Sequence, residues 1–84
     1  MTSEGDAKLF LQALIQIAAA CVHLQRGNAA PGIRLLSLAD TKLERFGSEF
    51  GGINTVLLRK GISRAQEHLR SGEAPGEVAK GFRL

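Results

Sequence analysis

Apolar residues along this chain recur at helical spacing in three groups, and glycine-containing breaks separate the groups. The first group, residues 9–24, is apolar around most of a helix circumference. One narrow polar stripe runs along it, made of Lys8, Gln12, Gln16 and His23. Ser3 or Asp6 can cap the start of a helix here, and Gly27 supplies the left-handed residue that commonly ends one. The pattern predicts a first helix over residues 6–26.

The second group has a single apolar face and predicts a helix over residues 29–46. Asn28 precedes it and is a suitable N-cap. Its buried face is expected to consist of Ile33, Leu36, Ala39, Leu43 and Phe46. The stretch over residues 47–53 contains three glycines, which predicts a loop that Phe50 or Ile53 anchors to the core.

The third group predicts a helix over residues 55–71 that begins at Asn54 or Thr55. Gly61 lies inside it, where glycine costs about 1 kcal/mol relative to alanine, and it indicates close approach of another backbone. The buried face is expected to hold Leu58, Ile62, Ala65 and Leu69. A short tail over residues 73–84 follows. The tail is expected to dock through Val78, Phe82 and Leu84.

These elements predict an all-α fold in one domain over residues 1–84, a three-helix antiparallel up-and-down bundle with a short C-terminal tail. Short connections favour antiparallel neighbours. A helix that is apolar nearly all round belongs in the middle of a larger protein, and 84 residues leave too little chain to surround it. We therefore expect oligomerisation to complete the bundle. The candidate contacts are Phe10, Leu14, Ile17, Ala18 and Cys21.

Composition limits which kinds of site and which cellular location are expected for the protein. The single cysteine, Cys21, excludes an internal disulfide and a cysteine-based zinc cluster. The acidic N-terminus does not resemble a secretory signal, and the apolar run is short and contains polar residues, so we expect a cytoplasmic protein without a membrane span. The net charge is +3, and the excess of basic residues lies entirely after residue 53.

Four segments together resemble domain-of-unknown-function family 309. They are Phe10-Leu-Gln-Ala-Leu-Ile-Gln-Ile-Ala-Ala-Ala20, Cys-Val-His23, Arg26-Gly-Asn28, and the run from Leu35-Leu36 to Leu43. The resemblance covers roughly residues 9–70 and is carried by order and spacing. It implies a small, mainly bacterial or archaeal, all-α protein whose activity is not established.

The resemblance has one gap. The family carries an upstream helix with His-Glu-x-x-Glu, and no such motif occurs in this chain, so no chemistry of that motif is carried over. The residues that match the family are Gln12, Gln16, His23 and Asn28. We take these four as candidate binding residues, at an interface or in a pocket. The absent helix would cover the face that residues 9–24 leave bare, and a second copy or another chain is expected to cover it instead.

Three functions are compatible with these patterns, and the favoured one is a non-enzymatic interaction module that forms a homodimer through the first helix. The second is a nucleic-acid-associated protein that uses the basic residues of the third helix. Those residues are Arg59, Lys60, Arg64 and Arg70. The third is an enzyme or metal site shared across a dimer interface around His23. It ranks lowest because no acid–base pair is visible, and we predict no catalytic residues, resident metal or cofactor.

Overall fold

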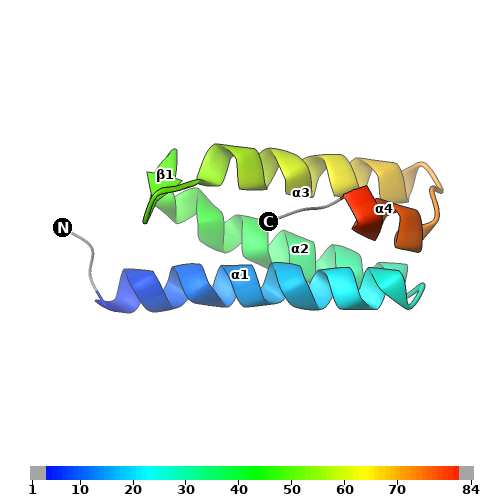
Figure 1. Cartoon of the computed structure of the whole chain (residues 1–84), viewed down its shortest axis with the longest axis horizontal. Helices are drawn as coiled ribbons and strands as arrows, with labels where there is room; N and C mark the ends of the chain where they lie inside the picture. Colours follow the sequence, from blue (N-terminus) through cyan, green and yellow to red (C-terminus); the bar gives the residue numbers. More distant parts are fainter. Residues whose placement is uncertain (1–3, 82–84) are drawn as a thin grey trace.

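The computed structural model describes residues 4–81, and these fold into helices with one small hairpin (Figure 1). The helices are α1 (Glu4–Gln25), α2 (Ala29–Leu43), α3 (Thr55–Arg70) and α4 (Pro75–Gly81). A 3-10 turn, Glu44–Phe46, extends α2. The hairpin pairs β1 (Glu49–Phe50) with β2 (Ile53–Asn54) in antiparallel fashion, with Phe50 opposite Ile53. The all-α prediction is confirmed.

The predicted three-helix bundle is not what forms, because the expected tail contains a fourth helix and the expected loop contains the hairpin. The helix α4 has only seven residues, two of them glycine, so its sequence carries little helical signal. It is held in place by packing against both α1 and α3. Val78 docks as expected and is 7% exposed. Phe82 and Leu84 lie outside the described residues.

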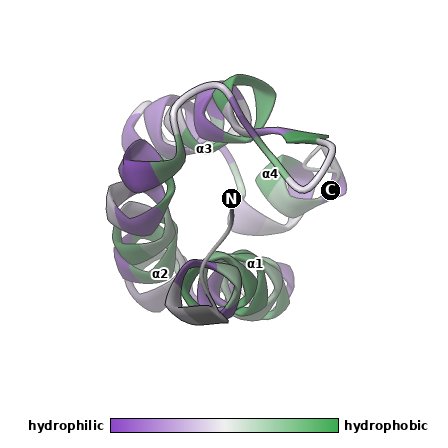
Figure 2. Cartoon of the chain, turned by 90° about the vertical axis from the view of Figure 1, so that its left-hand side faces the viewer, coloured by the Kyte–Doolittle hydropathy of each residue, from purple (hydrophilic) through white to green (hydrophobic). Residues whose placement is uncertain are grey.

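The four described helices follow one another around the bundle in chain order, as the end-on view shows (Figure 2). The helix α2 lies between α1 and α3, and α4 closes the circuit between α3 and α1. In Figure 1, α4 covers only the end of the bundle where α1 and α3 finish. In Figure 2, most of α1 has the green colour of hydrophobic residues, whereas the outer sides of α2 and α3 largely have the purple colour of hydrophilic residues.

Small residues let α1 and α2 approach closely. Ala13, Ala20 and Ala39 are fully buried, and Gly32 of α2 is buried against α1. A Cβ atom at Gly32 would lie 2.6 Å from Cδ2 and 2.8 Å from Cγ of Leu24. Glycine at this position is therefore a requirement of the helix contact rather than of the backbone conformation.

Glycine residues follow the C-termini of α1 and α3, and the one after α1 is the predicted Gly27. Gly27 adopts a φ of 82°, and the backbone N–H groups of Gly27 and Asn28 donate to the carbonyl oxygens of Leu24 and His23. Gly72, with a φ of 91°, repeats the arrangement after α3. Both are Schellman motifs, in which these two bonds satisfy otherwise unpaired carbonyls.

The predicted helix starts are partly wrong. The Asn54 side chain caps α3 by accepting from the N–H of Leu57 at 3.1 Å. Asn28 occupies the N-cap position of α2, but its side chain makes no capping hydrogen bond. The helix α1 starts before Asp6, so the Asp6 carboxylate lies inside the first turn and pairs with Arg45 at 3.1 Å.

Three aromatic rings close the end of the bundle that α4 does not reach. Phe10 of α1, Phe46 of the 3-10 turn and Phe50 of β1 lie with ring centroids 4.5–5.3 Å apart. Phe50 therefore anchors the hairpin, as the sequence predicts, while Ile53 stays 38% exposed. Edge-to-face and tilted ring contacts of this kind add to the burial of apolar surface.

Candidate functional site

The outer face of α1 is an apolar surface that the described part of the chain leaves uncovered. The helix buries one face completely, through Phe10, Ala13, Ile17, Ala20 and Leu24. On its opposite side, Leu11 is 56% exposed, Ile15 58% and Val22 47%, and Ala18 is exposed between them. These four residues, called here the outer stripe, recur at intervals of four, three and four. These intervals average about 3.7 residues, close to the 3.6 residues of a helical turn, which keeps the four side chains on one line along the helix.

The outer stripe lies on the side of α1 that faces away from α2. Gln16 marks the side of α1 toward α2, because it bonds to Lys42 of that helix. Asp6 bonds in the same way to Arg45 of the 3-10 turn that extends α2. At 3.6 residues per turn, all four stripe residues lie more than a quarter of the helix circumference away from Gln16. No Asp, Glu, Lys or Arg occurs between Leu9 and Gln25, so no ionised carboxylate, ammonium or guanidinium on α1 interrupts the stripe.

The contacts expected for an oligomer need correction. Phe10 is 5% exposed and Ile17 is fully buried, so both are already used inside the chain. The residue at position 18 is exposed as expected, and Leu14 and Cys21 are half-buried beside the stripe. Leu11, Ile15 and Val22 were not among the predicted contacts. An apolar pattern on all sides of a helix does not indicate which side its own chain covers.

The four residues that match the family lie along α1 and the turn after it, and the structure does not gather them into one pocket. Gln16 accepts a hydrogen bond from the Lys42 ammonium at 3.0 Å, so its partner comes from its own chain. Gln12 and Asn28 are exposed. Lys42 is half-buried in this contact. No signal in the sequence pairs it with Gln16.

His23 has one unusual feature: its Nδ1 atom is buried and has no hydrogen-bond partner among the residues that the structure describes. The part of the chain that the structure describes contains no group of three or more His, Cys, Asp or Glu side chains that could hold a metal ion. Around His23, therefore, the chain presents a single ring and no ligand set.

Cys21 is the only thiol in the chain, and it is half-buried on α1. Burial raises the pKa of this thiol above its ordinary value. A thiol with a raised pKa is protonated at neutral pH, and the protonated form is a poor nucleophile. The environment of Cys21 thus favours a packing role.

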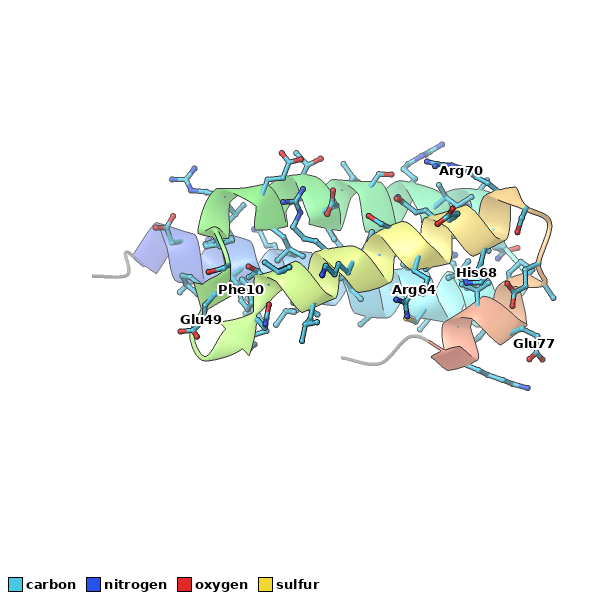
Figure 3. The ribbon with its side chains drawn as sticks, turned by 90° about the horizontal axis from the view of Figure 1, so that it is seen from above. Phe10, Glu49, Arg64, His68, Arg70 and Glu77 are labelled. Carbon is cyan, nitrogen blue, oxygen red and sulfur yellow. The ribbon has the colours of Figure 1, made fainter. Side chains whose placement is uncertain are left out.

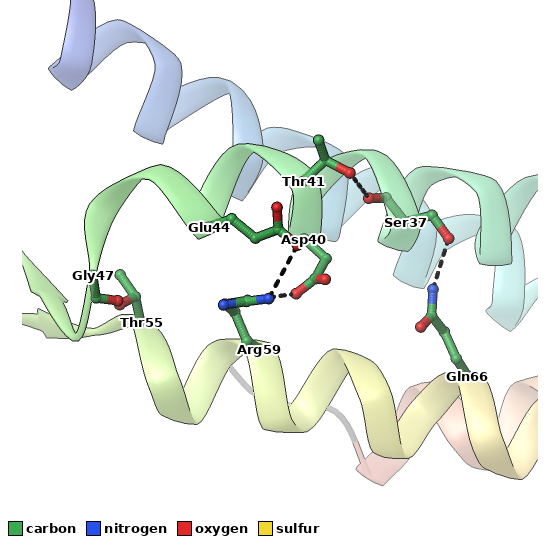
Figure 4. A network of polar contacts seen from close by, with 8 residues as sticks. All are labelled: Ser37, Asp40, Thr41, Glu44, Gly47, Thr55, Arg59 and Gln66. Atoms are coloured by element: carbon green, nitrogen blue, oxygen red, sulfur yellow. Dashed lines mark hydrogen bonds and ion pairs between the residues drawn. The ribbon is translucent and has the colours of Figure 1, made fainter.

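Three of the basic residues of α3, Arg59, Lys60 and Arg64, line one open depression, and Arg70 is not part of its lining. Arg59 turns toward α2, where its Nε donates to Asp40 at 2.9 Å and its Nη2 to Glu44 at 3.3 Å (Figure 4). The hydrogen bond to Asp40 raises the pKa of Arg59, so its charge is permanent and already paired. Arg64 lies on the side of α3 toward α4, and Arg70 lies at the far end of the helix (Figure 3). Asp40 and Glu67 line the same depression, so acidic side chains interrupt the basic surface there.

By length and composition, α1 is also the one described helix that would suit a membrane span, over Gly5–Gln25. Only 28% of its most apolar window is buried inside the chain. The ion pair of Asp6 and the hydrogen bond of Gln16 attach it to the bundle, as do its fully buried core residues. The low buried share shows that α1 has less cover than a bundle helix of this apolarity normally has.

Comparison with known families gives one match. The family described as Domain of unknown function (DUF309) matches residues 1–35, which include α1, the turn after it and the first part of α2. The predicted resemblance is thereby confirmed over this segment, and all four candidate residues, Gln12, Gln16, His23 and Asn28, lie within it. The match stops at residue 35, so the resemblance of residues 36–70 stays a prediction. No curated protein and no solved structure matches the chain.

Proposed function

We propose that this chain is a non-enzymatic helical interaction module that forms a homodimer through the outer stripe of α1. One observation carries the proposal: Leu11, Ile15 and Val22 are each about half exposed on a helix face that lacks Asp, Glu, Lys and Arg. An exposed apolar line of this kind on a small domain is typical of a protein-interaction surface. The matched family supplies no activity, so the proposal rests on the surface itself.

A second copy is the preferred occupant because the stripe is complementary to itself in an antiparallel arrangement. A two-fold axis between Ile15 and Ala18 would bring each Ile15 opposite the small Ala18 of the other copy. The same axis would bring Leu11 opposite Val22. Large residues would then face small ones at the centre, as helix packing requires, and one patch would serve both copies, as a two-fold interface requires.

The energy expected from the stripe sets the strength of the dimer. Complete burial of a Leu, Ile or Val side chain contributes about 1.5–3 kcal/mol, so covering a half-exposed one contributes about 1 kcal/mol. Leu11, Ile15 and Val22 from two copies then contribute about 6 kcal/mol before the cost of association, which is about 4–15 kcal/mol. Because this gain barely exceeds the lowest cost of association, the proposal predicts a weak dimer that forms only at high protein concentration.

A pair of charge substitutions tests the proposal. Ile15→Glu places a carboxylate in the middle of the stripe, and we expect it to keep the chain monomeric at every concentration in sedimentation velocity. Leu57→Glu is the matched control, because Leu57 lies on α3 and, at 64%, is the most exposed large apolar residue of the described part of the chain. It should dimerise as the parent chain does. Equal sedimentation of the parent and both variants would show that the stripe is not the interface.

Two other outcomes of the same experiment distinguish the alternatives. Recovery of the parent chain with membranes, and of Ile15→Glu in solution, would mean that α1 inserts into a bilayer; cytoplasmic localisation is part of our proposal. Binding of the monomeric variant to DNA or RNA at low salt, lost as salt rises, would favour the polyanion-binding hypothesis. That hypothesis is less favoured because Arg59 is already paired with Asp40 and Glu44.

A further inference from the structure

A groove of about 320 Å³ runs between α3 and α4, apart from the outer stripe of α1. Its apolar walls consist of Leu57, Leu58, Gly61, Ala65, Val78 and Gly81. Four ionisable side chains complete the lining: Arg64 and His68 from α3, Glu73 from the connection, and Glu77 from α4. Small-molecule sites in proteins typically have volumes from about 300 to 1,000 Å³ and combine apolar walls with a few polar groups.

The groove exists because α3 presents small residues where α4 ends. The lining residues of α3 recur every three or four positions, so they form one side of the helix. Gly61 sits in the middle of that side and does not adopt a positive φ, so its backbone conformation does not require glycine. A helix-interior glycine costs about 1 kcal/mol relative to alanine, and Gly61 adds no side chain to the groove that it lines. The close backbone approach expected at Gly61 stays a prediction.

The charges around the groove favour an anionic ligand. The Glu73 carboxylate contacts Nδ1 of His68, and the Glu77 carboxylate pairs with Lys80 at 3.3 Å. Each acid at the rim therefore already contacts a nitrogen atom, of the His68 imidazole or of the Lys80 ammonium. Arg64 is exposed at the edge of the groove, and no ion pair or hydrogen bond joins its guanidinium to any described residue. Figure 3 shows Arg64 and His68 on the side of α3 that faces α4.

We propose that this groove binds a small organic anion that combines a carboxylate with an apolar body. The guanidinium of Arg64 is suited to hold the carboxylate through two parallel hydrogen bonds. The apolar body would then lie over Gly61, Ala65 and Val78, which form an apolar floor. A ligand with an ammonium group fits less well, because Glu73 and Glu77 are already paired and Arg64 would repel it.

Octanoate is a suitable probe, titrated to about 20 mM against the labelled chain while amide shifts are recorded. Ligand efficiency limits for a molecule of this size predict a dissociation constant in the low-millimolar range. We expect the largest shifts at Gly61, Ala65 and Val78, and binding about tenfold weaker or more for octanol, which lacks the carboxylate. Equal binding of octanol, tighter binding of octylamine, or no shift at these residues would overturn the proposal.

Two variants with a matched control make the test specific to the groove. Arg64→Gln should weaken octanoate about tenfold, since it removes the charged donor. Lys60→Gln removes a neighbouring exposed charge of α3 outside the groove lining, and it should change the affinity by less than about twofold. Gly61→Leu should abolish binding by filling the groove, and circular dichroism confirms that each variant is folded. An equal loss of octanoate affinity in Arg64→Gln and Lys60→Gln would show that general charge attraction, and not the groove, binds the anion, and it would overturn the proposal.

Discussion

Gly32→Ala is expected to destabilise the fold, although alanine is the better helix former. The added Cβ would lie 2.6 Å and 2.8 Å from two carbon atoms of Leu24, whereas carbon atoms in contact normally lie about 3.5–4.0 Å apart. Relieving an overlap of about 1 Å requires Leu24 to leave its rotamer or α2 to move from α1. Leu24 is 1% exposed in the core, so it has little space into which to move.

The magnitude follows from two opposing effects. Overpacking in a well-filled core costs about 1–3 kcal/mol. Replacing a helical glycine by alanine returns about 1 kcal/mol. The expected net loss of unfolding free energy is about 1 kcal/mol, which in a domain of this size lowers the melting temperature by about 4–8 °C.

Gly76→Ala is the matched control for this substitution. Gly76 lies in α4, has no positive φ, and has no atom within 4 Å of the position that a Cβ would occupy. The same chemical change is therefore expected to raise stability, by up to about 1 kcal/mol. Thermal and urea unfolding should be compared in the Ile15→Glu background, so that dimerisation does not contribute. If Gly32→Ala stabilised the chain as much as Gly76→Ala, the close helix contact inferred here would be wrong.

Three further substitutions test other contacts. Thr55→Val removes the 2.6 Å hydrogen bond that the Thr55 hydroxyl donates to the Gly47 carbonyl, and it should lower the unfolding free energy by about 1–3 kcal/mol. Thr41→Val removes an exposed hydrogen bond to the Ser37 carbonyl and should have little effect. Urea unfolding of the two variants compares these losses. Asn54→Ala removes the α3 cap and should lose about 1 kcal/mol, and no loss in urea unfolding would contradict that role. Burial raises the pKa of Cys21, so the unfolded thiol ionises first and stability should fall as pH rises above about 8.5. Cys21→Ala should lack that component of the fall, and urea midpoints at neutral and alkaline pH measure it.

Helix positions and ends were largely predictable because their signals are local. Gly27 and the cap at Asn54 are read directly from residue chemistry, and the structure confirms both. The buried face of α2 followed from its three- and four-residue spacing, and Leu36, Ala39 and Leu43 are fully buried. Each of these predictions depends on residues within one or two helical turns.

Features that depend on contacts between distant segments were not predictable. The helix α4 forms because α1 and α3 support it, and its own sequence is too short and glycine-rich to indicate this. The ion pair of Arg59 with Asp40 joins two helices, as does the hydrogen bond between Gln16 and Lys42. Residue spacing within a helix carries no information about such partners.

The identity of the uncovered side of α1 also depends on contacts between distant segments. Residues 9–24 are apolar in nearly every direction, so the pattern has no preferred side. Gly32 and the buried alanines allow α2 to pack against one side, and this packing decides that Phe10 and Ile17 turn inward. The sequence therefore predicts that part of α1 is left uncovered, and only the fold identifies Leu11, Ile15, Ala18 and Val22 as that part.

Contacts between two copies of α1 can be observed directly by mixing isotope-labelled and unlabelled chains at about 1 mM or above, since a weak dimer is populated most at high concentration. We expect nuclear Overhauser effects between the methyl groups of Ile15 in one copy and Ala18 in the other, and between those of Leu11 and Val22. The absence of any such effect between copies, or effects that join only α3 residues such as Leu57, would show that the outer stripe is not covered by a second copy of the chain.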